Sequence, residues 1–362
     1  MSKILKIAKN GLINLSVVLL FLILIVFMGE VLLRVYHYYN YKINILNDAN
    51  HGLLSKDDKK GWKMSENLLY KNKEKDALNN IHNANIETNK YGFKLFDNQL
   101  SDKVKIFFIG DSFTAAMNVS NSEAFYGIIK DTIKNAEVFA YGAGGYGSLQ
   151  EFMVLDEFID VIKPNVIIWQ FYENDFLDND YKLDILKSFY NTGVPRPYLN
   201  LDGEITYRYV KHGNIFFRLP APISENIRLL KFLNTTLSKF INRISEKEML
   251  SEVSAQLPNI SEELQHSAKI TKMIMQMVKR RAGQVPIYLF CITAEQPYYN
   301  IIKNICKDLG IHFIGNIPLK LDKYEKEKPF ITKAADKLHL NKYGHLIVSE
   351  EIIKFLKANG AI

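Results

Sequence analysis

Short apolar runs alternate with amphipathic segments along most of this 362-residue chain. The runs are 104–110, 137–142, 165–172, 285–292 and 311–317, and the segments of helical spacing are 122–134, 149–163, 262–281, 298–309 and 342–358. Runs of this length that are apolar throughout are typical of strands buried on both faces. Strands that alternate with helices predict an α/β fold, a three-layer parallel sheet with helices on both faces.

The alternation is lost in two places. From about 177 to 261 the chain has a stretch rich in Pro and Tyr followed by helical patches, which we interpret as a cap segment inserted over the carboxyl ends of the strands. Ligands bind at that edge of such sheets. Residues 34–100 are polar and lack a sustained period, so we expect a membrane-proximal stalk that packs partly onto a domain over 101–360.

The amino terminus carries a different pattern. No charged side chain lies between Lys9 and Glu30, and a helix of that length matches the ~30 Å hydrocarbon layer. We expect a cytoplasmic tail over 1–10 and a transmembrane anchor over 11–33. Lysines cluster before the apolar run, so the positive-inside rule predicts a single-pass inner-membrane protein with its carboxyl-terminal domain in the periplasm. A cleaved signal peptide is the alternative, but no small-x-small cleavage site follows the run.

Composition adds little to this picture. Apolar residues make up 48% of the chain and charged residues 23%, as in globular proteins. The formal net charge of +7 is spread along the chain without a basic block interleaved with aromatic residues, so we expect no nucleic-acid partner. Cys291 and Cys306 lie in apolar settings, where either buried thiols or a disulfide would fit.

A candidate nucleophile and a candidate base occur far apart in the sequence. Ser112 directly follows the run 104–110, which predicts an exposed serine at a strand's carboxyl end, although Asp or Ser there also suits a helix cap. Asp336 and His339 are three residues apart, so the carboxylate can orient the imidazole, and the imidazole can activate a hydroxyl. His345 is better placed as a helix-face residue.

Acyl transfer also needs donors aimed at the developing oxyanion. Asn174 follows the run 165–172, at the same predicted sheet edge as Ser112. A glycine-rich turn follows the run 137–142 and can offer a backbone N–H. Its candidate glycines are Gly142, Gly144 and Gly145.

These motifs resemble the SGNH (GDSL-type) hydrolase superfamily. The resemblance covers 104–175 and about 262–358 through GDSF, GGYGS, END and DKLH. It implies a flavodoxin-like fold and an oxyanion hole formed by the Ser112 N–H, the Gly145 N–H and the Asn174 amide. Tyr172 stands where the family's third block begins with glycine, which implies a bulkier pocket wall.

Two further stretches, TNKYGF and GYGSLQE, resemble a subgroup of single-pass bacterial proteins. Several relatives in that subgroup modify envelope polysaccharides, as in alginate acetylation. The resemblance implies an acyl-ester substrate, with acetyl groups on a glycan as the expected case. A transferase working outside the cytoplasm would also need a membrane protein that donates the acyl group.

Dinucleotide binding and metal binding fit this sequence less well than acyl transfer does. GAGGYG fits the dinucleotide pattern G-x-G-x-x-G, but the next strand ends at Glu173, about thirty residues on rather than twenty. We therefore expect no cofactor, and the absence of clustered Cys and His ligands predicts no metal. A non-catalytic glycan-binding module, an esterase of lipids or small esters, and the choice between hydrolase and acyltransferase remain open.

Overall fold

The computed structural model describes residues 2–41, 53–184, 195–208, 227, 229 and 260–362, and the chain forms two compact units. One unit comprises 1–51 and 214–245, and the other comprises 52–213 and 246–362. The helical patches expected between 209 and 259 lie outside the described residues.

In the first unit, α1 (Ser2–Tyr41) is a single helix, longer at both ends than the predicted anchor. Its stretch Ile13–Tyr36 is long and apolar enough to cross a membrane, and none of it is buried. Its length and composition fit either a membrane anchor or a signal sequence. In its carboxyl-terminal part, Glu30 accepts hydrogen bonds from Arg34 at 2.6 Å and from the Leu229 N–H at 2.7 Å.

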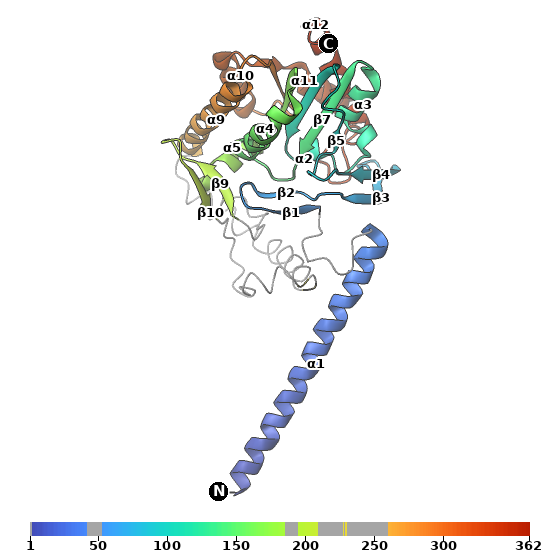
Figure 1. Cartoon of the computed structure of the whole chain (residues 1–362), viewed down its shortest axis with the longest axis vertical. Coiled ribbons are helices and arrows are strands. Elements are labelled where there is room, and N and C mark those ends of the chain that lie inside the picture. Colours follow the sequence, from blue (N-terminus) through green and yellow to red (C-terminus); the bar gives the residue numbers. More distant parts are fainter. Residues whose placement is uncertain (1, 42–52, 185–194, 209–226, 228, 230–259) are drawn as a thin grey trace. The chain divides into compact units, whose positions relative to one another are not determined.

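The second unit is built on a six-stranded sheet (Figure 1). Its order is β12-β11-β8-β6-β7-β5, and every pairing is parallel except that of β5 with β7. The parallel strands thus follow the flavodoxin-like order, which confirms the predicted fold class. They are β6 (Val104–Gly110), β7 (Ala136–Gly142), β8 (Val166–Phe171), β11 (Ile287–Cys291) and β12 (His312–Ile314); the antiparallel edge strand is β5 (Leu95–Phe96).

Helices cover both faces of this sheet (Figure 1). Successive residues of β6 point to opposite faces: Phe107 and Ile109 belong to one core cluster, and Ile106 and Phe108 to the other. The first cluster includes side chains of α4 (Ser148–Ile162), α9 (Ile260–Ala282) and α10 (Tyr298–Leu309). The second includes side chains of α3 (Phe125–Thr132), α11 (Asn316–Glu327) and α12 (Lys342–Ala358).

One predicted strand is shorter than expected. The run 311–317 was expected to be extended throughout, but β12 ends at Ile314 and α11 begins at Asn316. Pro318 falls in the first turn of α11, where its missing N–H costs no helical hydrogen bond. The turn at Gly315 and this helix were not predicted.

Most of the expected stalk is folded onto the sheet domain. Residues 54–87 form two antiparallel hairpins, and Trp62, Met64 and Ile86 from them belong to the first core cluster. The hairpins are β1 (Leu54–Asp57) with β2 (Gly61–Met64), and β3 (Leu69–Lys75) with β4 (Ile81–Glu87). A third hairpin, β9 (Arg196–Leu199) with β10 (Ile205–Arg208), lies in the predicted insertion.

Candidate active site

Ser112 lies at the carboxyl end of β6, as predicted. It begins α2 (Ser112–Ala115), a single turn that ends when Ala116 adopts a left-handed conformation. Asp111 is the cap of this turn, and its Oδ1 accepts the Phe113 N–H at 2.8 Å. The cap role that the sequence offered to either residue therefore belongs to Asp111, which leaves the Ser112 hydroxyl available.

Asp336 and His339 are brought to this serine by a tight turn before α12. The Ser112 Oγ lies 2.8 Å from His339 Nε2, and His339 Nδ1 lies 2.6 Å from Asp336 Oδ2. The turn is closed by the Ala334 N–H, which donates to the His339 carbonyl at 2.8 Å, and Lys337 within it has a φ of 60°. Three residues from two distant parts of the sequence thus form one hydrogen-bonded chain.

The Asp336 carboxylate is ionised at neutral pH. Partial burial alone would raise its pKa, but hydrogen bonds from the His339 ring and from the Leu338 and His339 N–H groups lower it to about 2. An ionised carboxylate accepts from the imidazole, so Nδ1 carries the proton and Nε2 is left to accept the Ser112 hydroxyl. This is the tautomer that a general base requires.

Aromatic rings hold the imidazole from the side. The Phe113 ring lies 4.9 Å from the His339 ring and 4.7 Å from the Tyr172 ring, centroid to centroid. Tyr172 occupies the position where the family motif has glycine. The bulkier residue at this position therefore places a ring against Phe113, tilted by 48° to it.

The predicted oxyanion donors lie at the carboxyl ends of neighbouring strands. Gly145 follows β7, and Asn174 begins α5 (Asn174–Asn179) after β8; in the sheet, β7 and β8 flank β6. Asn174 Nδ2 donates to Asp178 Oδ2 at 2.7 Å, which orients the amide. The Ser112 and Gly145 N–H groups donate to no acceptor among the described residues.

The three candidate glycines differ in their surroundings. A Cβ on Gly142 would lie 2.4 Å from the Ala115 nitrogen, so this glycine is needed for the close approach of β7 to α2. Gly144 has open space where a side chain would be. Gly145 has a φ of 73°, a left-handed conformation that glycine adopts without strain, and it remains the candidate for the oxyanion hole.

Four buried carboxyl groups interact with one another, and one of them, Asp111, directly precedes Ser112; sequence reasoning missed this group. Asp111, Glu151, Asp175 and Asp178 are each at most 5% exposed. Burial raises the pKa of Glu151 well above its usual range, reinforced by Asp175 and Asp111, while its Oε2 accepts from the Trp169 indole at 2.6 Å. Burial also raises the pKa of Asp111 to about 6, although the Phe113 N–H and His339 lower it.

Three other residues that the sequence singled out are buried in the core. His345 is buried on α12, where its Nδ1 accepts the Phe125 N–H at 3.4 Å, and burial lowers its pKa to about 3. It is therefore neutral and is packed in the core rather than placed at the site. Cys291 and Cys306 are both buried free thiols.

A group that could ligate a metal forms from distant residues. Ligand atoms of Asp180, Glu263 and His266 lie within 4.8 Å of one another. Sequence reasoning missed this group because more than eighty residues separate Asp180 from the other two. In the structure the three are held by ion pairs, His266 with Asp180 at 2.5 Å and Lys182 with Glu263 at 2.9 Å.

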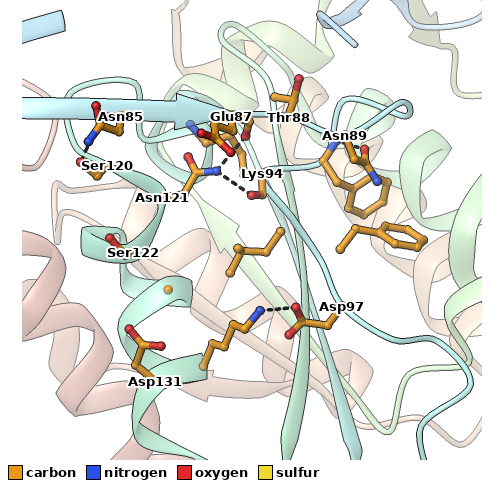
Figure 2. Close-up of a pocket in the computed structure, with 15 residues that line it drawn as sticks. Asn85, Glu87, Thr88, Asn89, Lys94, Asp97, Ser120, Asn121, Ser122 and Asp131 are labelled. Carbon is orange, nitrogen blue, oxygen red and sulfur yellow. Dashed lines mark hydrogen bonds and ion pairs between the residues drawn. The ribbon is translucent and has the colours of Figure 1, made fainter. Parts of the chain in front are cut away.

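A cavity of about 610 Å³ lies beside the sheet's β5 edge (Figure 2). Its wall is largely polar: Asn121 Nδ2 donates to the carbonyls of Glu87 and Lys94, each at 2.7 Å, and Lys130 pairs with Asp97. The catalytic candidates are not among its lining residues. The Ser-His-Asp chain therefore lies outside this cavity.

Several solved structures are similar to this chain, whereas no protein-family model and no curated protein matches it. A lipase/acylhydrolase from Enterococcus faecalis is 13% identical, with 71% of this chain and 96% of that one covered and a TM-score of 0.39. A lipolytic protein of the G-D-S-L family from Veillonella parvula is 10% identical, with 69% of this chain and 97% of that one covered and a TM-score of 0.36. An acetylxylan esterase from Geobacillus stearothermophilus is 11% identical, with 70% of this chain and 94% of that one covered and a TM-score of 0.36.

The titration of Asp111 gives a prediction about stability. Because its folded pKa of about 6 is above the ordinary value of 3.8, the folded state is penalised as pH rises from about 4 to 6, by roughly 3 kcal/mol in all. Asp111→Asn keeps the cap oxygen and removes the buried charge. Melting temperatures of the two proteins should coincide near pH 3 and diverge in favour of Asp111→Asn by pH 7. If the difference between the two melting temperatures stayed the same from pH 3 to pH 7, the raised pKa of Asp111 would be refuted.

Proposed function

We propose that this chain is a serine esterase or O-acyltransferase that works through an acyl-enzyme, with Ser112 as nucleophile, His339 as general base and Asp336 as the orienting acid. The observation that carries the proposal is the hydrogen-bonded order of these side chains, at 2.8 Å from Ser112 to His339 and 2.6 Å from His339 to Asp336. Distances in this range are what proton transfer requires.

The reaction follows from this geometry. Ser112 Oγ attacks the ester carbonyl carbon and gives its proton to His339 Nε2, while Asp336 stabilises the imidazolium. The carbonyl oxygen becomes an oxyanion, held by the N–H groups of Ser112 and Gly145 and by the Asn174 amide. When the intermediate collapses, the leaving alcohol takes the proton from His339 and the acyl group remains on Ser112.

The second half of the reaction decides between hydrolase and transferase. Water or a sugar hydroxyl attacks the acyl-Ser112 carbonyl, its proton passes to His339, and Ser112 leaves with that proton restored. In an acyltransferase outside the cytoplasm, the acyl group would come from a membrane acyl-donor protein. The same residues serve both outcomes.

The proposed substrate is an acetyl ester of a cell-envelope polysaccharide. The TNKYGF and GYGSLQE stretches support a role in polysaccharide acetylation, and one similar structure is an acetylxylan esterase. A lipid or small-ester substrate is the alternative within catalysis. The hydrogen-bonded order of competent residues favours catalysis over a non-catalytic glycan-binding module.

We also propose that α1 is an uncleaved anchor and that the catalytic domain lies in the periplasm. Lys3, Lys6 and Lys9 precede the apolar stretch, and such lysines stay on the cytoplasmic side. This placement would put the catalytic domain beside the membrane and near envelope glycans.

Replacement of the nucleophile or the base tests the catalytic assignment. The full-length protein in detergent should react with a fluorophosphonate probe and cleave p-nitrophenyl acetate. Ser112→Ala should abolish both activities, and His339→Ala should lower them by roughly 10⁴-fold or more, because the members of a triad act as a unit. Circular dichroism should show that both variants are folded. Wild-type rates in the two folded variants would refute the triad.

Acetyl analysis of the envelope polysaccharide separates the two reaction types. Cells that carry Ser112→Ala in place of the wild-type protein should contain less glycan acetyl if the enzyme is a transferase and more if it is a hydrolase. An unchanged acetyl content, with the fluorophosphonate reaction intact in the wild type, would direct the search to lipids or small esters.

A reporter fusion tests the proposed topology. Alkaline phosphatase, which is active only outside the cytoplasm, should be active when fused after Ile362. The fusion should also remain in the membrane fraction at full length if α1 is not cleaved. Activity of a cytoplasmic reporter at the same position would overturn the orientation.

A further inference from the structure

Arg196 is a buried charge that belongs to the predicted insertion. It begins β9, is 4% exposed, and lies with its guanidinium 5.0 Å from the centroid of the Trp62 ring. Trp62 comes from β2, in the segment that was expected to be a stalk. Side chains from two segments outside the parallel sheet therefore meet as a stacked pair, an arrangement that contributes favourable cation–π attraction.

Two carboxylates compensate the charge of Arg196. Its Nη1 pairs with the Asp178 carboxylate and lies 3.4 Å from the Asp178 carbonyl oxygen, and its Nε lies 3.2 Å from Asp184 Oδ2. Burial would lower the pKa of the guanidinium, but these two acids raise it, so Arg196 stays charged. A buried arginine held by paired carboxylates has few alternative conformations, because leaving any of these charges unpaired is costly.

The same guanidinium holds the glycine turn. Its Nη2 donates to the Gly145 carbonyl at 2.7 Å, and the Trp62 indole Nε1 donates to the Gly144 carbonyl at 2.9 Å. The Gly144 carbonyl and the Gly145 N–H belong to one planar trans peptide and point in opposite directions. Trp62 therefore sets the direction of the Gly145 N–H. Arg196 fixes the next peptide along the chain, which carries the Gly145 carbonyl.

Arg196 is connected to the second candidate donor through one residue. The Asp178 carboxylate that pairs with Arg196 also accepts Asn174 Nδ2 at 2.7 Å. Because that bond occupies one amide hydrogen, it sets the direction of the other. One guanidinium is thus linked to both the Gly145 peptide and the Asn174 amide.

We infer that Arg196 and Trp62 are positioning residues of the oxyanion hole, an inference that rests on the proposed esterase or transferase function. Trp62 holds the peptide that carries the Gly145 N–H, and Arg196 holds the next peptide and, through Asp178, the Asn174 amide. The hairpins β1–β2 and β9–β10 therefore contribute to the transition state without touching the substrate. A purely structural role for Arg196 would lower stability and leave the turnover of the folded protein unchanged.

Arg196→Lys tests this inference in the full-length protein in detergent. Lysine keeps the positive charge but cannot hold Asp178, Asp184 and the Gly145 carbonyl at once. We expect kcat for p-nitrophenyl acetate to fall by roughly 100-fold while KM changes by less than about threefold, because a displaced donor is felt mainly in the transition state. The rate of fluorophosphonate labelling should fall in parallel.

The matched control is Arg208→Lys. Arg208 lies on β10 opposite Arg196 in the same hairpin and is exposed, and the one polar or ring interaction of its side chain among the described residues is with the Tyr181 ring, at 4.8 Å. This variant should keep wild-type kcat, KM and labelling rate. If it lost activity to the same extent as Arg196→Lys, the effect would belong to the hairpin as a whole, and the positioning role would be refuted.

Trp62→Phe provides a second test that does not alter the buried charge. Phenylalanine keeps an aromatic ring against Arg196 but removes the indole N–H, so kcat should fall roughly tenfold, the scale of one hydrogen bond, with little change in KM. If Arg196→Lys does not fold, this variant decides the question. Wild-type kcat in a folded Trp62→Phe, or in a folded Arg196→Lys, would overturn the inference.

Ser112→Ala is measured beside these variants so that two failures can be told apart. If the wild type does not label at Ser112, the proposed function fails and the inference fails with it. If the wild type labels, Ser112→Ala does not, and both positioning variants label at the wild-type rate, only the inference fails.

Discussion

The parallel sheet is the constraint on which the rest of this structure depends. Its central strands are buried on both faces, so β6, β7 and β8 have no room for polar side chains except where they end. Because the strands are parallel, those ends share one edge. Ser112, the glycine turn and Asn174 follow three strands that are adjacent in the sheet, although about sixty residues separate the first from the last. A parallel topology therefore gathers the candidate site without any direct bond among these residues.

The site also depends on which groups form hydrogen bonds with the backbone near Ser112 and near His339. Asp111 caps the short turn α2, so the serine hydroxyl need not do so. The left-handed Lys337 and the hydrogen bond from Ala334 then fold residues 334–340 into a turn that presents His339. Each of these features is local, yet together they close the distance between Ser112 and His339, which are 227 residues apart in the sequence.

Sequence reasoning succeeded where the determining signal is local. Asparagine is a preferred helix cap, and α12 begins at the residue after Asn341, as predicted. The Asn341 Oδ1 accepts the Gly344 N–H at 3.0 Å. It failed where a turn interrupts an apolar run, as at Gly315, because the run 311–317 contains no change of period at that point. The motifs located Ser112, Asp336 and His339, since each lies in a short pattern with its neighbours.

Trp62 and Arg196 gave no such signal. Their bonds to the glycine turn span 82 and 51 residues, and neither residue lies in a recognisable pattern. Nothing in a sequence distinguishes a buried arginine with two acidic partners from a solvated one. The missed interactions are all long-range contacts of single side chains, which only the folded chain specifies.

The charges around the nucleophile explain why such contacts matter. Asp178 and Asp184 together outweigh the single positive charge of Arg196, and His339 lies close enough to Asp111 to lower the pKa of that carboxyl. Negative charge here favours an imidazolium but opposes an oxyanion. Stabilisation of an oxyanion at this site would therefore have to come from fixed N–H dipoles, whose effect depends steeply on direction and distance. The hydrogen bonds that hold the glycine turn and the Asn174 amide in place would act directly on that stabilisation.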